Sequence, residues 1–158
     1  MKRNLFLSLI LIGCCACSND ARLLSGDYSY KTSGSVVVAT DTEEVTYQLP
    51  DKIGQLNVVD LKATDKDSVL LVFNEMGGNL TTTYARISGD SIELLPYTTT
   101  LSITTGSGAG TYDITVSGTG MRYDDLIMLR ETYNGEAKTD TITIKIHGNH
   151  ISTVANRN

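Results

Sequence analysis

The sequence predicts an all-β protein, an antiparallel up-and-down barrel of about eight to ten strands, with a two-sheet β-sandwich as the alternative. Threonine occurs 21 times in the 158 residues, and threonine, valine, isoleucine and tyrosine favour pleated, half-buried surfaces. Short segments of alternating apolar and polar residues recur between glycine-containing turns. Beyond the N-terminal apolar run, no window of about 11 or more residues has a helical period. These three observations favour hairpin-connected strands over helices.

The expected strands follow from this alternation. Ser68 to Phe73 is nearly all apolar and predicts a central, buried strand. In Thr111 to Ser117, apolar residues at every second position predict a strand with one face in the core. The full set of expected strands is 27–39, 44–49, 56–63, 68–73, 80–87, 91–95, 98–104, 111–117, 126–133 and 138–147.

Several segments between and after the strands also carry local signals. Asn134-Gly135 has the strongest preference for a two-residue hairpin turn and is expected to lie between the last two strands. Pro50 and Pro96 are expected at strand ends, because proline cannot donate a ladder hydrogen bond. A single helical turn is compatible with residues 119–127. The tail from Gly148 is polar and is expected to be loose.

The charge balance argues against two classes of function. The chain has 13 Lys and Arg against 18 Asp and Glu, a formal net charge of −5. Lys2 and Arg3 fall within an N-terminal export signal, and without them 11 basic side chains face 18 acidic ones, or −7. A nucleic-acid-binding protein needs a basic surface against the phosphates, and electrostatic docking on anionic lipid needs one too. No nucleic-acid partner is expected.

The first 17 residues have the layout of a secretory signal. Lys2 and Arg3 precede an apolar run from Leu5 to Ile12 that only Ser8 interrupts. The run is too short to cross a bilayer as a helix, which needs about 20 residues. Three cysteines follow and none occurs later in the chain. The exported domain is therefore expected to have no internal disulfide and to be held together by packing.

The cysteines make this signal resemble that of bacterial lipoproteins, in which Leu, a variable residue and Gly or Ala precede the acylated cysteine. Residues 11–14, Leu-Ile-Gly-Cys, match the pattern directly. Residues 16–20, Ala-Cys-Ser-Asn-Asp, resemble the start of many Bacteroidetes lipoproteins. We expect Cys17 to be the acylated residue, with Cys14 as the alternative.

The resemblance implies a division of the chain and a location. The expected parts are a signal peptide at 1–16, an acylated cysteine and tether at 17–25, and a single β-barrel domain at 26–158. The protein is expected to be held by its lipid anchor at the outer membrane of a Gram-negative bacterium, on either the periplasmic or the exposed face.

The strand pattern resembles the calycin-like β-barrel lipoproteins of Bacteroidetes, which are related in fold to lipocalins. The resemblance covers roughly residues 26–147 and is carried by Gly26 to Tyr30, by the succession of hairpins and by Gly110 to Val116. Lipocalins have Gly-x-Trp in the first strand. This chain has no Trp, and Gly26 and Tyr28 stand at that spacing. No ligand-binding residue is therefore carried over.

Few residues suggest catalysis or metal binding. His147 and His150 would need a carboxylate to complete a metal site, and we interpret them as exposed residues at a strand end. Adjacent acidic residues on a strand, as in Glu43-Glu44 and Asp124-Asp125, point to opposite faces. Asp65 and Asp67 lack the spacing of a calcium loop.

Two motifs of enzymes are also missing from the sequence. Gly106 to Gly110 lacks the Gly-Lys-Ser/Thr ending of a phosphate-binding loop and is expected to be a hairpin loop. No Gly-x-Ser-x-Gly nucleophile motif occurs. No catalytic residue, cofactor or metal is predicted, and an enzyme is not expected.

Tyrosine is the one enrichment that suggests binding. Tyrosine offers an apolar ring and a polar tip, which suits a binding cleft, although it also fills β cores. A ligand site would need several of these rings to converge. Eight Tyr stand against two Phe and no Trp, at positions 28, 30, 47, 84, 97, 112, 123 and 133.

Two classes of function are expected from these observations. The first is a binding protein whose barrel holds a small apolar or sugar-like ligand in a pocket of several hundred cubic ångströms. The alternative is a non-enzymatic accessory protein of the envelope, with a filled core and an exposed patch that docks an outer-membrane protein. A barrel of about eight strands is compatible with both.

Overall fold

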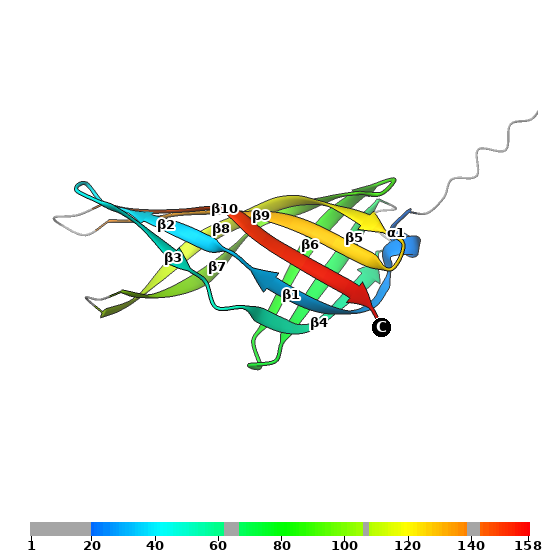
Figure 1. Cartoon of the computed structure of the whole chain (residues 1–158). Coiled ribbons are helices and arrows are strands. Elements are labelled where there is room, and N and C mark those ends of the chain that lie inside the picture. Colours follow the sequence, from blue (N-terminus) through cyan, green and yellow to red (C-terminus); the bar gives the residue numbers. More distant parts are fainter. Residues whose placement is uncertain (1–19, 62–66, 106–107, 139–142) are drawn as a thin grey trace, which may run out of the picture.

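The computed structural model describes residues 20–61, 67–105, 108–138 and 143–158. These residues form one short helix and a ten-stranded antiparallel sheet (Figure 1). The elements are α1 (Asp20–Leu24), β1 (Gly26–Ser33), β2 (Ser35–Ala39), β3 (Glu44–Gln48), β4 (Lys52–Asp60), β5 (Ser68–Glu75), β6 (Leu80–Ser88), β7 (Ser91–Thr105), β8 (Gly108–Tyr123), β9 (Leu126–Lys138) and β10 (Thr143–Arg157).

Eight of the strands form a closed up-and-down barrel. Their order is β1-β4-β5-β6-β7-β8-β9-β10, and β1 also pairs with β10. The two remaining strands, β2 and β3, are a hairpin inserted between β1 and β4, and β2 pairs with β10. The barrel predicted from the sequence is confirmed, and the sandwich alternative is not needed.

The barrel interior near α1 is an apolar core. Alternate residues of each strand point inward, as Tyr28 and Tyr30 do in β1 and Leu56 and Val58 do in β4. The helix α1, which lies within the segment 17–25, packs on this core through two fully buried residues. The buried residues of α1 are Ala21 and Leu24.

A second apolar core lies toward the β2–β3 hairpin. The strands β7 to β10 are 13 to 16 residues long, whereas β1, β4, β5 and β6 have 8 or 9. The long strands extend beyond the short ones, toward the hairpin at the left of Figure 1. Their buried side chains pack with those of β2, and the fully buried or nearly buried members include Val36, Ile114, Val116, Ile146 and Ile151.

The outward-facing positions of the long strands are mostly polar. They include Thr98 of β7, Asp113 of β8, Arg130 of β9 and Lys145 of β10, all exposed. None of the described residues forms a helix long and apolar enough to cross a membrane.

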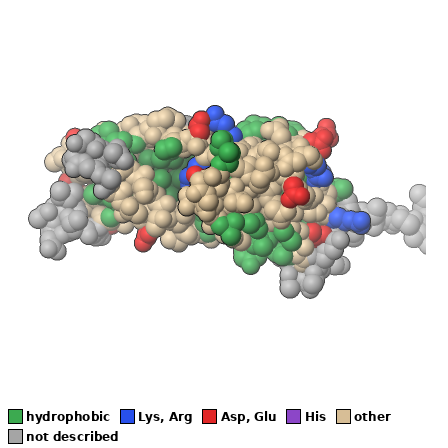
Figure 2. All heavy atoms as spheres, turned by 90° about the horizontal axis from the view of Figure 1, so that it is seen from below, with side chains coloured by type: hydrophobic (Ala, Val, Ile, Leu, Met, Phe, Trp, Pro, Cys, Tyr) green, Lys and Arg blue, Asp and Glu red, His purple; other side chains and the backbone are tan. Residues whose placement is uncertain are grey.

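Exposed apolar side chains gather on the outside of β4, β5 and β6. Val59 lies opposite Leu70, and Leu70 lies opposite Tyr84, so the three form a row across the strands. Val59 and Tyr84 are exposed and Leu70 is half-buried. Figure 2 shows one face of the molecule, on which hydrophobic side chains gather in patches within a largely polar surface.

The expected turn at Asn134-Gly135 is wrong, because β9 continues through both residues. Gly135 pairs with Ile114 of β8 on one side and with Ile146 of β10 on the other. A Cβ on Gly135 would lie 2.8 Å from Ile114 Cγ2 and 2.9 Å from the Asp113 carbonyl oxygen. The glycine therefore permits a close approach between strands, and it does not form a turn.

The expected loose tail is also wrong. From Gly148 the chain continues to Arg157 as part of β10 and closes the barrel against β1. Ile151, Thr153 and Ala155 point inward and are buried. A register shift between Gly148 and Ile151 interrupts the alternation, which hides this part of the strand in the sequence pattern.

The helical turn considered for residues 119–127 does not form. Residues up to Tyr123 belong to β8, and β9 begins at Leu126. Asp124 makes the tight turn between them with a φ of 48°. Aspartate tolerates this left-handed conformation better than most residues do.

We predict that Tyr28→Phe destabilises the fold by about 1–2 kcal/mol. The Tyr28 hydroxyl donates to the Leu24 carbonyl oxygen at 2.7 Å and accepts from Arg157 Nη2 at 2.7 Å, which joins α1 to β1 and β10. Tyr28 is fully buried, so these partners would be left without the hydroxyl. Urea unfolding of the full chain, followed by tyrosine fluorescence, measures the change. Tyr84→Phe, on the exposed outer face, is the control and should shift stability by less than about 0.5 kcal/mol.

Candidate functional site

A polar cavity lies between the two apolar cores and has two adjoining parts that share lining residues, and both are partly open to solvent. The inner chamber has a volume of about 30 Å³, and four aromatic rings, two carboxylates and one ammonium group line it. These side chains are Tyr30, Phe73, Tyr97, Tyr133, Glu75, Glu131 and Lys52. The outer chamber has a volume of about 220 Å³ and shares Lys52, Glu75 and Tyr133 with the inner one.

The outer chamber opens where the strands of the barrel separate. A bulge between Leu94 and Tyr97 ends the pairing of β7 with β6, which covers only residues 85–88 against 91–94. Pro96, expected at a strand end, instead lies within this bulge in β7. Beyond the bulge, β7 pairs with β8 alone, so the start of β6 is left apart from it. The expected position of Pro50 is confirmed, since it lies between β3 and β4 and lines the opening.

Glu131 is the central polar group of the inner chamber. Its side chain points inward from β9 and is only 5% exposed. The Thr153 hydroxyl of β10 donates to Glu131 Oε1 at 2.7 Å, and the Tyr133 hydroxyl also hydrogen-bonds the carboxylate. Thr32 of β1 hydrogen-bonds Thr153 in turn. Because the Thr153 proton is directed at Glu131, Thr32 is the donor in that second bond.

The environment of Glu131 favours its neutral form. Burial raises the pKa of the Glu131 carboxyl, while the hydrogen bonds from Thr153 and Tyr133 and the charge of Lys52 lower it in part. Burial and the nearby carboxylates Glu75 and Glu131 raise the pKa of Tyr30 to about 12. Burial first, and then the charge of Glu131, also raise the pKa values of Tyr97 and Tyr133. The tyrosines are therefore neutral hydroxyl groups at physiological pH.

The tyrosines identified in the sequence divide into four groups. Tyr30, Tyr97 and Tyr133 come from β1, β7 and β9 and converge on the inner chamber. The others lie elsewhere: Tyr28 is in the core beneath α1, Tyr47 and Tyr112 pack against the second core, and Tyr84 and Tyr123 are exposed.

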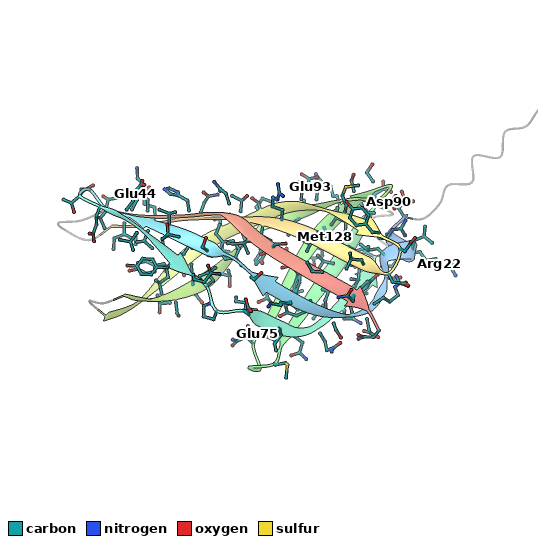
Figure 3. The ribbon with its side chains drawn as sticks, in the orientation of Figure 1. Arg22, Glu44, Glu75, Asp90, Glu93 and Met128 are labelled. Carbon is teal, nitrogen blue, oxygen red and sulfur yellow. The ribbon has the colours of Figure 1, made fainter. Side chains whose placement is uncertain are left out.

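Neither Glu43-Glu44 nor Asp124-Asp125 lines the cavity. Glu43 and Glu44 are exposed beside the tip of the β2–β3 hairpin, and Figure 3 shows Glu44 far from Glu75 at the rim of the cavity. Asp124 and Asp125 are exposed in the β8–β9 turn. Asp67 is exposed, and Asp65 lies outside the described residues.

His147 does not line the cavity. His147 lies on β10 and is exposed, and the side chain of His150 is outside the described part of the chain, as are Cys14 and Cys17. Residues 106–107 of the glycine-rich loop are outside it too, and Thr105 pairs with Gly108 as expected of a hairpin. Among the described residues, no group of three or more His, Cys, Asp or Glu could hold a metal ion.

Glu131 was missed in the sequence although a signal for it exists. Ile127, Leu129, Glu131 and Tyr133 occupy alternate positions of one strand, and the other three are apolar or aromatic. A carboxylate in an otherwise apolar inward face is a buried charge, and such groups concentrate at functional sites.

Comparison with known proteins gives structural likenesses only. No protein-family model matches the sequence, and the search of curated proteins gives no significant match. A putative outer membrane protein of Bacteroides fragilis is 14% identical to this chain, with a TM-score of 0.42. The match covers 89% of this chain and 53% of the Bacteroides protein, so this chain spans about half the length of that protein. Ail, the attachment invasion locus protein of Yersinia pestis, is 9% identical with a TM-score of 0.38, covering 84% of this chain and 99% of its own.

We predict that Glu131→Gln stabilises the protein at neutral pH. The pKa of Glu131 in the folded protein is raised above its unfolded value near 4.5. The stability that this carboxyl contributes is therefore fully present below that value, and it is lost as the pH rises through the folded-state pKa. Glutamine keeps an acceptor for Thr153 and carries no charge. At pH 7 the free energy of unfolding of the variant should exceed that of the parent by more than about 0.5 kcal/mol, which is the usual limit for a surface substitution. The difference between the two should become smaller toward pH 4.

Urea unfolding from pH 4 to pH 8 measures this difference. Glu136→Gln is the matched control, since Glu136 is exposed on the same strand, and it should change the pH profile much less than Glu131→Gln does. A Glu131→Gln variant that is less stable than the parent at pH 7 would show that the carboxylate strengthens the fold.

Proposed function

We propose that the protein is an exported, lipid-anchored barrel of the cell envelope that binds a small polar ligand in the cavity between its two cores. The observation that carries the proposal is the convergence of Tyr30, Tyr97 and Tyr133 on the buried carboxylate of Glu131. Ligand sites combine apolar ring surface with a few placed polar groups, and this cavity has both.

The lining favours the polar half of the range of ligands expected from the sequence. The chambers share Thr32, Lys52, Glu75, Asn79 and Tyr133. An apolar ligand would cover these groups without replacing their hydrogen bonds to water, which costs free energy. A sugar-like or other polar molecule can supply donors and acceptors in place of water. The outer chamber has a volume of about 220 Å³, and pockets for drug-sized ligands have at least about 300 Å³. The outer chamber therefore suits a molecule smaller than most drugs.

The proposed anchor is the acylated Cys17, with Cys14 as the alternative, at the outer membrane. Three observations support it: the lipobox-like sequence, the start of α1 three residues after Cys17, and the polar outward face of the long strands. A barrel with such a surface is suited to water beside a membrane, with acyl chains as its hold on the lipid. We assign binding and not catalysis, in keeping with the absence of a nucleophile motif in the sequence.

We predict that the full chain, purified from its native envelope in neutral detergent, carries a polar small molecule. Native mass spectrometry should show an adduct that denaturation removes. Tyr97→Ala, which takes away one ring of the inner chamber, should lower the occupied fraction several-fold, whereas Tyr84→Ala on the outer face should not. A parent protein whose native and denatured masses agree, from several preparations, would contradict the proposed function.

We predict that Cys17→Ser abolishes acylation and Cys14→Ser leaves it intact. Metabolic labelling with a radioactive or clickable fatty acid, followed by gel electrophoresis, measures the acyl chains directly. The thiol of the acceptor cysteine takes the diacylglycerol, and serine cannot replace it. The reverse result would move the anchor to Cys14 and leave the rest of the proposal unchanged, while labelling of both variants would exclude either cysteine as the sole acceptor.

An accessory role without a ligand is the second candidate, and the row of Val59, Leu70 and Tyr84 favours it. Contiguous apolar surface on a water-facing sheet commonly marks a protein contact. If an outer-membrane protein docks on this row, cross-linking should capture it with the parent protein and fail to capture it with Leu70→Glu. Thr98→Glu, on the polar face of β7, should still be cross-linked to the partner.

A further inference from the structure

We propose that the inner chamber recognises a primary ammonium group of the ligand, held by the carboxylate of Glu131 within a box of aromatic rings. This inference rests on the proposed ligand-binding function and names the chemical class of ligand. The rest of the ligand occupies the outer chamber.

The walls of the inner chamber suit a cation. Four of its lining residues are aromatic, and the rings of Tyr30 and Phe73 meet edge to face at 85° with centroids 5.2 Å apart, which makes a corner. Tyr97 and Tyr133 contribute the further rings. The face of an aromatic ring attracts an ammonium group through the ring quadrupole, and desolvation strengthens the attraction.

The size of the chamber selects the kind of cation. A volume of about 30 Å³ holds one or two groups of the size of water, since a single water needs about 10–15 Å³ on this measure. A primary ammonium group is of that size. A trimethylated ammonium group or a sugar ring is several times larger than this volume, and the adjoining outer chamber of about 220 Å³ has the room for it.

The charges of the site also favour an ammonium group. The Glu131 carboxylate receives hydrogen bonds from Thr153 and Tyr133, and a carboxylate can accept about four, so it has acceptor capacity left. Glu75 places a second carboxylate in the wall. A cation that enters gives the desolvated Glu131 a charged, hydrogen-bonding partner.

Among the residues that the structure describes, Lys52 is the one basic side chain that lines the two chambers, and it competes with the ligand. Its charge acts on Glu131, yet no ion pair within 4.0 Å joins it to Glu131 or Glu75 in the described part of the chain. The Glu131 carboxylate therefore lines the inner chamber without a direct ion pair to Lys52. Removal of the Lys52 charge should tighten the binding of an amine.

The affinity for an amine should rise with pH. An ammonium group gains most from ionised Glu131, so binding should tighten as the pH rises through the pKa of that carboxyl in the free protein. The other titratable groups around it are Tyr30, Tyr97, Tyr133, Glu75 and Lys52. The raised pKa values of the three tyrosines keep them neutral over this range.

The test compares probes that differ in charge and size. n-Propylamine, n-propanol and tetramethylammonium are titrated at pH 8 into the full chain in neutral detergent, with ¹⁵N-labelled protein and nuclear magnetic resonance shifts as the readout. We expect saturable binding of propylammonium and binding of the other two weaker by at least about tenfold, because neither provides a small charged donor. Weakening of propylamine binding toward pH 5 is expected as well.

Variants separate the role of Glu131 from that of the fold. Glu131→Gln should weaken propylamine binding by at least about tenfold, and Glu136→Gln on the same strand should leave it unchanged. Lys52→Met should strengthen binding, and Lys31→Met, on the outer face beside Asp51, should have no effect. Unchanged spectra outside the cavity establish that each variant is folded.

Three results would overturn the inference: equal binding of propanol, wild-type binding by Glu131→Gln, or no propylamine binding at all. The native mass measurement distinguishes these from a failure of the proposed function. A neutral polar adduct in the purified protein would leave ligand binding in place and remove only the ammonium group from it. The absence of both an adduct and propylamine binding would refute the two together.

Discussion

The pairing of β1 with β10 is the constraint on which the barrel and its cavity both depend. It joins the first and last strands, and its register places Thr32 directly opposite Thr153. Thr32 hydrogen-bonds Thr153, and Thr153 donates to Glu131 on the neighbouring strand. The closure of the sheet therefore also orients the carboxylate of the site. The same seam extends to the helix end, where Arg157 of β10 hydrogen-bonds the Tyr28 hydroxyl and the Leu23 carbonyl oxygen.

The polar cavity separates two apolar cores that are enclosed in different ways. The core under α1 is surrounded by eight paired strands, whereas the second core is covered by the long strands and the β2–β3 hairpin. A barrel filled by apolar side chains alone would be expected to be more stable, because a desolvated carboxylate such as Glu131 is costly. The fold tolerates this cost with two hydroxyl donors and with aromatic walls. Such a local sacrifice of stability is typical of a binding site and not of a purely structural core.

Much of the barrel could be predicted from the sequence, because the alternation of apolar and polar residues determines both the strand and its inward face. The failures occur where local chemistry and long-range pairing disagree. Asn134-Gly135 has the composition of a turn, yet Gly135 fits where β8, β9 and β10 approach closely. The end of β10 was hidden by the register shift near Gly148. For the site, the tyrosine enrichment was visible, but the convergence of Tyr30, Tyr97 and Tyr133 depends on strand registers far apart in the chain. Glu131 was visible in principle, as a charge among inward apolar positions.

The irregularities of the barrel lie around its cavity, and this explains why a regular pattern could not locate the site. The bulge at Leu94 and Tyr97 turns β7 away from β6, opens the outer chamber and brings Tyr97 to the inner one. The shift between Gly148 and Ile151 resets β10 so that Ile151 lines the outer chamber and Thr153 reaches Glu131. A bulge alters the direction of a strand and the facing of its side chains. An eight-stranded barrel without these two features would be narrow enough for side chains to fill. The departures from regular pairing therefore lie where the cavity opens between the strands.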